Sequence, residues 1–447
     1  MQTNFSSQQL QNPAIAEAES ILRKCVHCGF CTATCPTFNL LGDELDSPRG
    51  RIYLIKDMLE NDRPATKQVV THIDRCLSCL SCMTTCPSGV HYMHLVDHAR
   101  AHIEESYQRP VTDRLVRWLL AFVLPYPGRF RLSIFAAFFT RPFAGVLRRM
   151  SGPFKRLGAM LALAPSKLPP RSVHEGKVVL PAAGPRRGRV AIMSGCAQPV
   201  LAPSINDATI RLLTRNSIEV VQAAGEGCCG ALVHHMGHED SALDQARANV
   251  DAWTAQIEAD GLDAILITAS GCGTTVKDYG FMLREDPDYK DKAARVSSLT
   301  KDVTEYLETV DLGEGGHAPA LTVAYHSACS MQHGQKITTT PKVLLSKAGY
   351  SVRDVPDGHL CCGSAGVYNI LQSDIAMRLR ARKVANIERT DPDVIATGNI
   401  GCMTQIAGGT RIPIIHTVEL LDWAQGGPMP ATLEEAGFKW KDTAART

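Results

Sequence analysis

The chain has 447 residues, of which 45% are hydrophobic and 21% are charged, and its formal net charge is +2. This near balance excludes a globally basic nucleic-acid-binding protein and an acidic disordered tail, and the length predicts about three domains. The sequence is unusual in having 16 cysteines. Because the polar N-terminal residues do not have the basic and apolar regions of a signal peptide, we expect these cysteines to bind metal or to do redox chemistry.

The first cysteines form two runs with the spacing C-x2-C-x2-C-x3-C-P, from Cys25 to Pro36 and from Cys76 to Pro87. In such a run three thiolates curl around one iron–sulfur cube, and the fourth, placed before a proline, is turned toward the other cube. Two zinc sites are the alternative, but zinc prefers two pairs of ligands. The spacing therefore predicts two [4Fe–4S] clusters, the first bound by Cys25, Cys28, Cys31 and Cys86 and the second by Cys76, Cys79, Cys82 and Cys35.

The 40 residues between Cys35 and Cys76 are too many for a minimal bacterial ferredoxin, and residues 51–59 and 67–74 have helical patterns. Residues 1–110 therefore resemble the helical ferredoxin domain of respiratory iron–sulfur subunits. Three polar residues inside the ligand loops could donate hydrogen bonds to cluster sulfurs or could face solvent; they are His27, Ser78 and Ser81.

Residues 111–188 contain no cysteine and have an asymmetric charge pattern. No acidic residue lies between Arg114 and His174, and aromatic residues are interleaved with the basic ones. This composition suits a segment that lies on anionic lipid, and it equally suits a helical connector that packs on a partner subunit. The basic residues of this span are Arg114, Arg117, Arg129, Arg131, Arg141, Arg148, Arg149, Lys155, Arg156, Lys167 and Arg171.

The same region is not expected to cross a membrane. Its longest uncharged stretches, residues 118–128 and 132–140, are too short to span a bilayer. Residues 151–188 hold many prolines, glycines and basic residues, and we expect them to form a linker.

The remaining cysteines belong to an internal repeat. A step of 133 residues relates the first three cysteines of one copy to those of the other, and a step of 130 residues relates the last ones. The first copy has Cys196, Cys228, Cys229 and Cys272, and the second has Cys329, Cys361, Cys362 and Cys402.

Both copies alternate short apolar strands with helical patterns, which predicts parallel sheets. The predicted helices include residues 207–216, 242–260, 340–348 and 374–389, and the predicted strands include 264–268 and 394–397. We therefore expect an α+β multidomain protein, in which the ferredoxin-type domain precedes two pseudo-symmetric α/β lobes, residues 189–312 and 313–447. Each cysteine of the repeat then follows the carboxyl end of a strand, where open α/β sheets bind ligands.

The Cys-Cys-Gly motifs place two sulfurs on one tight turn, and the glycine lets the backbone pass close to a bulky group. Each copy resembles the CCG domains of heterodisulfide reductases and of the iron–sulfur subunits of flavin oxidases. The family pattern ends in C-x-x-C and its five cysteines bind a non-cube cluster, whereas Thr275 and Gln405 stand at the fifth position here. Four interpretations stay open: a four-thiolate cluster in at least one lobe, a module kept for fold and docking, a zinc site, and redox-active thiols.

Other chemistry is not indicated. Four histidines near the repeat cysteines are expected to be hydrogen-bonded polar or turn residues rather than ligands; they are His234, His235, His326 and His333. The sequence has no G-x-G-x-x-G turn between a strand and a helix and no P-loop, so we predict no FAD or NAD site and no catalytic residue in this chain. An electron relay of this kind needs a partner that carries the hydride-handling cofactor.

The segment from Cys25 to Tyr53, with its Ser47-Pro48-Arg49-Gly50 extension, resembles the glycolate oxidase iron–sulfur subunit, and both Cys-Cys-Gly repeats follow in the family order. The resemblance covers nearly the whole chain. It implies a hetero-oligomer with FAD-binding subunits that oxidise glycolate to glyoxylate, and electron flow through the two clusters to a quinone or another membrane acceptor. From the charge asymmetry of residues 114–174 we expect a cytoplasmic protein that is peripheral on the inner face of the cytoplasmic membrane, with these residues as the contact.

Two rival functions stay open. An iron–sulfur subunit of a related lactate or glycerol-3-phosphate oxidase would look similar, because the flavin subunit selects the substrate. A heterodisulfide-reductase-like catalytic subunit would instead do chemistry at the Cys-Cys-Gly sites, and the missing fifth cysteines count against it.

Overall fold

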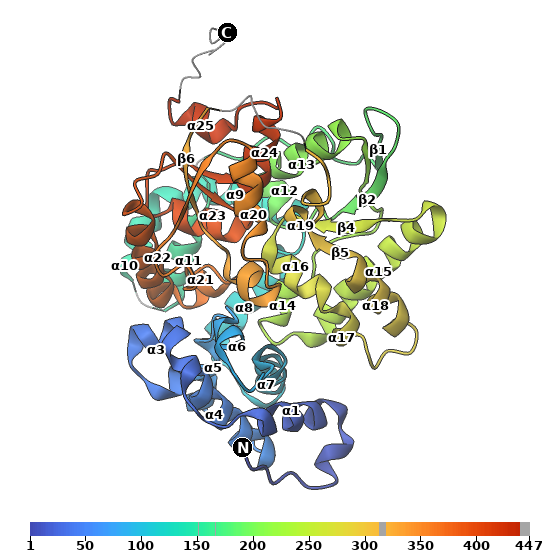
Figure 1. Ribbon diagram of the computed structural model, residues 1–447. Coiled ribbons are helices and arrows are strands. Elements are labelled where there is room, and N and C mark those ends of the chain that lie inside the picture. The colour runs from blue at the N-terminus through green and yellow to red at the C-terminus, as the bar shows by residue number, and fades with distance from the viewer. Residues whose placement is uncertain (151, 166, 313–318, 439–447) are drawn as a thin grey trace.

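The computed structural model describes residues 1–150, 152–165, 167–312 and 319–438. A helical N-terminal domain lies below two α/β lobes, which stand side by side above it (Figure 1). The predicted α+β organisation is confirmed. Residue 313, where we expect the second lobe to begin, lies outside the described residues.

The N-terminal domain is helical, as predicted. Its core is built from the buried faces of the longer helices and includes Ile55, Ile73, Leu95 and Ala99. The predicted helices at 51–59 and 67–74 are confirmed as α4 and α5. The elements are η1 (Gln9–Gln11), α1 (Pro13–Lys24), α2 (Phe30–Thr34), α3 (Pro36–Leu41), η2 (Glu44–Asp46), α4 (Pro48–Glu60), α5 (Lys67–Asp74), α6 (Ser81–Thr85) and α7 (Tyr92–Ser106).

The connecting segment contains more helix than the sequence predicts. Its elements are α8 (Val111–Val123), α9 (Pro127–Thr140), η3 (Arg141–Phe143), α10 (Ala144–Arg149) and α11 (Pro153–Leu163). The expectation of a linker over 151–188 is therefore wrong for α11, which packs against α8, α10 and the second lobe. Pro153 stands at the start of this helix, where proline is tolerated, so composition alone was misleading.

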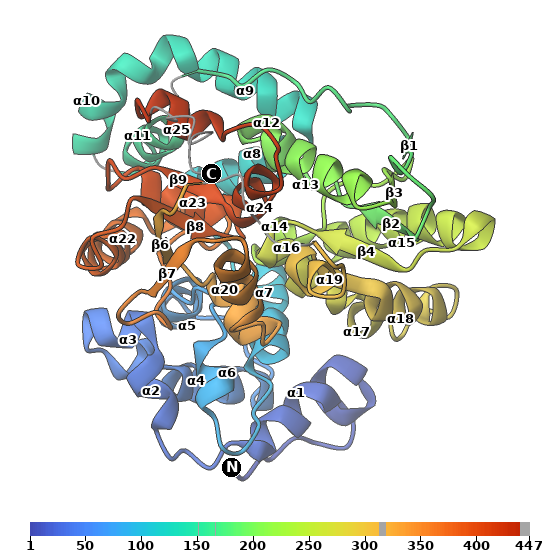
Figure 2. The same ribbon diagram turned by 45° about the horizontal axis from the view of Figure 1, so that its top comes forward.

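One stretch of the connecting segment, Pro127–Leu147, is long and apolar enough to cross a membrane by length and composition, and 6% of its most apolar window is buried in the described structure. Arg131 and Arg141 interrupt this apolar sequence, so none of its uncharged stretches is long enough by itself to span a bilayer. Its α9 part lies along the protein surface, with Ile134 buried and α12 in contact, at the top of Figure 2.

The two lobes have related sheets. The first has the strand order β1-β3-β2-β4-β5 and the second β7-β6-β8-β9. All neighbouring strands are parallel except the short β1, which adds an antiparallel edge to the first sheet. Apart from β1, both sheets repeat one order, so the predicted pseudo-symmetry is confirmed.

The predicted helices at 207–216, 242–260, 340–348 and 374–389 and the predicted strands at 264–268 and 394–397 are confirmed with small shifts at their ends. The structure adds further elements, and the full set for each lobe is as follows. In the first lobe they are β1 (Val179–Leu180), β2 (Gly188–Ile192), α12 (Gln198–Leu201), α13 (Ser204–Arg215), β3 (Ile218–Val221), α14 (Ala231–His234), α15 (Glu239–Asp260), β4 (Ala264–Ile267), α16 (Ser270–Lys277), α17 (Tyr279–Met282), α18 (Lys290–Leu299), β5 (Thr300–Asp302) and α19 (Val303–Leu307).

In the second lobe they are β6 (Thr322–Tyr325), the π-helical turn η4 (Ser330–Gly334), α20 (Thr340–Lys347), β7 (Ser351–Asp354), α21 (Tyr368–Leu371), α22 (Ser373–Glu388), β8 (Val394–Thr397), α23 (Ile400–Ala407), β9 (Ile414–His416), α24 (Thr417–Ala424) and α25 (Ala431–Glu435).

The lobes pack on each other through one shared core that includes Leu213 of the first and Leu421 of the second. At its edge the fully buried carboxylate of Asp422 pairs with Arg211 at 2.7 Å and with Arg215 at 3.0 Å. Because both arginines come from α13 and the aspartate from α24, this charge network fixes the relative position of the lobes.

Candidate iron–sulfur sites

The first predicted ligand set lies around one cavity of the N-terminal domain. Its sulfur-bearing lining includes Cys25, Cys28, Cys31 and Cys86. The loop reaches around the cavity because His27 and Gly29 have positive φ angles of 55° and 83°, a conformation that turns successive backbone N–H groups to one side. Burial is the main cause that raises the pKa of the Cys31 thiol, to about 11.

The second predicted set lines a neighbouring cavity, which contains Cys35, Cys76, Cys79 and Cys82. The second ligand loop repeats the conformation of the first, since Ser78 and Leu80 have φ angles of 48° and 61°. Cys82, Pro48 and Tyr92 line both cavities, so the two sites are adjacent.

The donors of both cavities fit iron–sulfur clusters. Each cavity is lined by the four cysteines of its predicted ligand set, with Cys82 as a fifth in the first cavity, and no carboxylate of the described residues lines either one. Soft thiolate ligands select iron–sulfur clusters or zinc over hard cations. Burial disfavours ionisation of a thiol, so a bound cation is needed to stabilise its thiolate form. The iron of a cluster would supply this positive charge.

Arginines of the Ser-Pro-Arg-Gly-Arg extension face the two cavities, one each. Arg49 lines the first cavity, and its guanidinium would lie 2.6 Å from a Cβ at Gly29, so the glycine makes room for it. Arg51 lines the second cavity, is 1% exposed, and lies with its Nη1 3.8 Å from the Cys35 sulfur. Ser47 caps α4 by accepting from Gly50 N. A Cβ at Gly50 would lie 2.1 Å from the carbonyl of Glu44.

Polar side chains also reach the sulfurs of the second set. The Tyr92 hydroxyl donates to the Cys76 sulfur at 3.7 Å, and the Thr37 hydroxyl lies 3.3 Å from the Cys35 sulfur. Hydrogen bonds to cluster sulfurs raise the reduction potential of a cluster. Sequence reasoning missed these residues, and the Ser-Pro-Arg-Gly-Arg extension was the signal that could have found the arginines.

The three loop residues with a predicted role lie in different surroundings. Ser78 lines the second cavity and accepts a hydrogen bond from Arg100 at 2.6 Å, which leaves its O–H available as a donor. The Ser81 side chain is fully buried, and its hydroxyl has no partner among the described residues. His27 lines the first cavity, with an unpartnered Nε2. All three therefore retain a group that can donate, and Ser78 and His27 are the two that line a cavity.

The second lobe brings its four repeat cysteines together beyond the carboxyl ends of β6, β7 and β8. The sulfurs of Cys329 and Cys361 lie 3.7 Å apart, and Cys362 interacts with Cys361 and Cys402. The Gly363 N–H donates to the Cys361 sulfur at 3.4 Å. The Cys-Cys-Gly turn thus holds its sulfurs in one buried cluster.

This second-lobe cluster adjoins the second cavity of the N-terminal domain. Cys79 packs with Leu77, Cys361 and Tyr368 in one buried cluster. After burial, the neighbouring Cys361 thiol is the largest cause that raises the pKa of Cys79. The Tyr368 hydroxyl donates to the Arg75 carbonyl at 3.0 Å across the same interface. Three sulfur sites therefore follow one another from the N-terminal domain into the second lobe.

The first lobe also gathers its four cysteines. Cys228 interacts with Cys196 and Cys229, and Cys229 interacts with Cys272. The core around them, which includes Trp253, is built from first-lobe residues.

The four histidines near the repeat cysteines have different hydrogen-bond partners and surroundings. His333 is hydrogen-bonded to Thr84 at 2.8 Å and to the His359 carbonyl at 3.1 Å, as expected for a polar interface residue. His234 and His235 lie against Asp97 at 4.0 and 3.9 Å. Burial opposes ionisation of Asp97, but these histidines and Arg100 outweigh it and lower its pKa. The expectation is wrong for His326, whose two ring nitrogens have no partner among the described residues.

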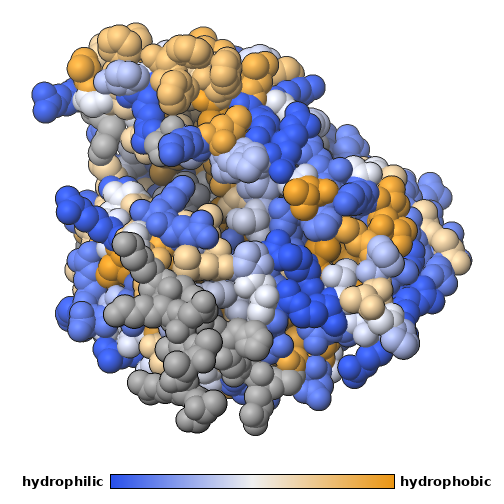
Figure 3. Space-filling model, turned by 90° about the horizontal axis from the view of Figure 1, so that it is seen from above, coloured by the Kyte–Doolittle hydropathy of each residue, from blue (hydrophilic) through white to orange (hydrophobic). Residues whose placement is uncertain are grey.

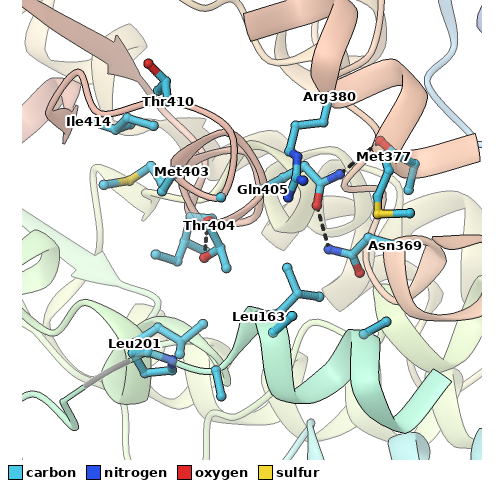
Figure 4. Close-up of a pocket in the computed structure, with 18 of the residues that line it drawn as sticks. Leu163, Leu201, Asn369, Met377, Arg380, Met403, Thr404, Gln405, Thr410 and Ile414 are labelled. Carbon is cyan, nitrogen blue, oxygen red and sulfur yellow. Dashed lines mark hydrogen bonds between the residues drawn. The ribbon is translucent and has the colours of Figure 1, made fainter. Parts of the chain in front are cut away.

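A larger cavity of about 1030 Å³ lies between α11 and the second lobe. Figure 4 shows Arg380, Gln405 and Asn369 pointing toward one another on one side, with Leu163 and Leu201 on the opposite side. Asn369 donates to Gln405 at 3.2 Å. The helix α23 lines the cavity with Met403 and Thr404 and also carries Cys402.

Two family models match the chain in the places that the geometry marks. The model for a 4Fe-4S dicluster domain matches residues 21–90, and the model for a cysteine-rich domain matches residues 190–277 and 323–407. The glycolate oxidase iron-sulfur subunit of Escherichia coli K12 is 44% identical over 95% of this chain and 99% of that protein.

The chain belongs to the glycolate oxidase iron–sulfur subunit family. The probable glycolate oxidase iron-sulfur subunit of Bacillus subtilis 168 is 30% identical over 95% of this chain and 99% of its own length. The lactate utilization protein A of Bacillus licheniformis is 24% identical and matches 52% of this chain. As a member of this family the chain is an iron–sulfur electron-transfer component of an oxidoreductase.

Proposed function

We propose that this chain takes electrons from an FAD-containing partner subunit that oxidises glycolate to glyoxylate, and passes them through two [4Fe–4S] clusters toward a quinone. Cys25, Cys28, Cys31 and Cys86 hold the first cluster, and Cys35, Cys76, Cys79 and Cys82 hold the second. When bound, such clusters accept and release single electrons. The observation that carries this proposal is the pair of adjacent cavities, each lined by the four cysteines of one predicted ligand set and both lined by Cys82.

The protein's part in this transfer is to hold and tune the two centres. Crossed ligation joins the two halves of the N-terminal domain at the clusters themselves. Arg49 and Arg51 place a positive charge at each cavity, which favours the more negative, reduced state of a cluster. The buried sulfurs of the second lobe extend the row beyond Cys79, so we place a third cluster there.

The choice of glycolate as the substrate is inferred from the names of the relatives, because no residue of this chain indicates it. Two relatives that match 95% of this chain are named for glycolate oxidase, whereas the lactate utilization protein, matched along 99% of its own length, covers 52% of this chain. We expect the chain, reconstituted with its FAD subunits, to support glycolate-dependent reduction of an acceptor, with lactate as a poor substrate. The chain alone should oxidise neither. Faster oxidation of lactate, or turnover by the chain alone, would contradict the proposal.

The same assay distinguishes a heterodisulfide-reductase-like catalytic subunit. Chemistry at the Cys-Cys-Gly sites would require both lobes, so Cys228→Ala and Cys361→Ala would each abolish turnover. A relay that uses only the second lobe predicts that Cys228→Ala leaves glycolate oxidation unchanged while Cys361→Ala slows it.

The acceptor side of the proposal rests on the surface of α9 and α10. Phe135, Phe138 and Phe139 of α9 are exposed, and hydrophobic side chains gather along the upper edge of the molecule in Figure 3, where Figure 2 places these helices. Within the described residues, the arginines at 129, 131, 141 and 149 make no ion pair with a carboxylate. An apolar surface with unneutralised arginines suits the interface of an anionic bilayer.

We infer that α9 rests on the bilayer surface and does not span the bilayer. Ile134 faces inward and α9 contacts α12, and a spanning helix would have to break these contacts. We therefore place the protein on the inner face of the cytoplasmic membrane, as a peripheral subunit. The cavity between α11 and the second lobe gives an amphiphilic quinone a place, with apolar walls and N–H donors from Asn369 and Arg380.

A vesicle experiment tests both parts. The complex should float with vesicles of anionic lipid at low salt and reduce a quinone dissolved in them. Replacing Phe138 and Phe139 with serine should reduce both flotation and quinone reduction. The free energy of membrane binding weakens by about 25 cal/mol for each Å² of apolar area that is no longer buried in the bilayer. Ala162→Trp, which fills the cavity from α11, should keep flotation and lose quinone reduction.

The controls separate the two claims. A soluble dye that accepts electrons directly from the clusters should be reduced equally by all variants. Flotation that does not depend on anionic lipid would contradict the membrane contact. Full quinone reduction by the Ala162→Trp variant would contradict the cavity as the quinone site.

A further inference from the structure

His326 is a buried histidine without a hydrogen-bond partner for its ring among the described residues. It follows β6 directly and is 2% exposed. Its backbone N–H donates to the Ala396 carbonyl at 2.8 Å, which fixes the residue at the end of the sheet, yet neither Nδ1 nor Nε2 has a partner in the part of the chain that the structure describes. Leaving a buried polar group unpaired is unfavourable, so such a group calls for an explanation.

The imidazole of His326 is directed into the sulfur site of the second lobe. One of its ring nitrogens and the sulfurs of Cys362 and Cys402 all lie within 4.8 Å of one another, and all three residues are buried. Imidazole nitrogen replaces cysteine sulfur as an iron ligand in some iron–sulfur clusters. The geometry therefore gives the second lobe a fifth donor in addition to its four thiols.

The position of the missing fifth cysteine does not supply that donor. Gln405, which stands there in the second lobe, donates to the Ala376 carbonyl at 3.2 Å and accepts from Asn369 at 3.2 Å. The first lobe has Thr275 at the same position, with its hydroxyl turned to the Gly271 carbonyl. His326 is thus the group that can complete a five-donor set in the second lobe.

The first lobe has no equivalent imidazole at this position. Met193 follows β2 as His326 follows β6, and its N–H donates to the Leu266 carbonyl at 3.0 Å, the counterpart of the bond from His326 to Ala396. Met193 is 3% exposed and packs in the first-lobe core with Cys229. The two lobes therefore place different side chains at one structural position.

A second difference between the lobes concerns charge. Lys383 of α22 is 2% exposed, and its ammonium donates to the carbonyls of Asp357 and Gly358 at 3.0 and 3.4 Å. Its counterpart on α15 is the neutral Asn249, which bonds to Gly227 and Cys228. This correspondence follows from the Cys-Cys-Gly glycines, because Gly230 lies against Ala242 and Gly363 against Ala376. A buried cation beside four thiolates favours an anionic cluster in the second lobe.

We propose that His326 is a nitrogen ligand of an iron–sulfur cluster held by Cys329, Cys361, Cys362 and Cys402, and that the first lobe, with Met193 and Asn249, holds no such cluster. The inference rests on the proposed iron–sulfur function and specifies its third centre. The second-lobe cluster, which adjoins the N-terminal cluster bound by Cys79, would then have both nitrogen and sulfur ligands.

The test uses the full chain, purified anaerobically after growth with ¹⁴N- or ¹⁵N-histidine. We expect more than the roughly eight irons that two cubes account for, and a paramagnetic signal whose electron–nuclear coupling changes with the nitrogen isotope. His326→Cys should retain the iron, lose the nitrogen coupling and lower the potential of that cluster, because a charged thiolate replaces a neutral imidazole. His326→Met, which copies the first lobe, should lose the third cluster and its iron.

Two controls limit the interpretation. His333→Gln removes a buried histidine of the same lobe and should leave the nitrogen coupling unchanged. Cys228→Ala in the first lobe should leave the iron content unchanged. A wild-type chain with about eight irons, a third signal without nitrogen coupling, or a coupling that persists in His326→Cys would overturn the inference while leaving the two N-terminal clusters and the proposed function intact. A chain without iron would overturn the proposed function itself.

Discussion

Replacing Cys86 with alanine is expected to remove about four irons per chain from the site of Cys25, Cys28 and Cys31, although Cys86 belongs to the second cysteine run. The sulfurs of these four residues line one cavity, so a cube at that site loses one of its four ligands. Cys28→Ala should change the same paramagnetic signal as Cys86→Ala. Both variants should abolish glycolate-dependent reduction of the acceptor by the reconstituted complex, because the row of centres is broken.

The reciprocal pair completes the experiment. Cys35→Ala and Cys79→Ala should both change the signal of the other cluster, since Cys35 lines the cavity of the second run. Ligation within each run would give the opposite pairing, with Cys86→Ala grouped with Cys79→Ala, and that result would refute crossed ligation. Iron and sulfide quantitation on anaerobic protein, with the paramagnetic spectra, decides between the two.

Replacing Arg51 with methionine is expected to lower the free energy of unfolding of the N-terminal domain by about 3 kcal/mol. The Arg51 guanidinium is buried and donates to the His72 carbonyl at 2.7 Å and to Thr37 at 3.0 Å. It also pairs with the fully buried Asp46 at 3.4 Å. Methionine fills a similar volume but leaves these acceptors and the Cys35 sulfur without their cation, so the second cluster should also be lost more readily.

Arg49→Met is the matched control, because Arg49 comes from the same motif and faces the other cavity. Its side chain is 37% exposed and pairs with the exposed Glu44, so its loss should change the free energy of unfolding far less than the loss of Arg51. Urea titrations of anaerobic protein, followed through the visible absorbance of the clusters, measure both variants. Equal loss of stability in the two variants would show that burial of the Arg51 network does not govern stability here.

Local sequence patterns were sufficient to predict much of the fold. The spacing of the cysteine runs predicts two similar ligand loops, and both loops have the same alternation of positive φ angles at His27 and Gly29 and at Ser78 and Leu80. The helices α4, α5, α15 and α22 follow from apolar periodicity. These features depend on interactions between residues a few positions apart, which the sequence shows directly.

Composition was less reliable in the connecting segment. The connecting segment contains α11 in a region rich in proline and glycine, and a long apolar stretch in α9 and α10 that arginines interrupt. Proline at the first turn of a helix is compatible with helical structure, so α11 forms although its sequence resembles a linker.

The order of the amino acids was enough to establish the two cluster-binding motifs, the repeat of the lobes and the family. The folded arrangement was needed to place Cys361 beside Cys79, which are 282 positions apart. It was also needed to find His326 unpartnered among the described residues and to give the two lobes different charges at Lys383 and Asn249. The physical reason is that thiol spacing and helix period are fixed by neighbouring residues, whereas the surroundings of a buried side chain are fixed by how whole domains pack.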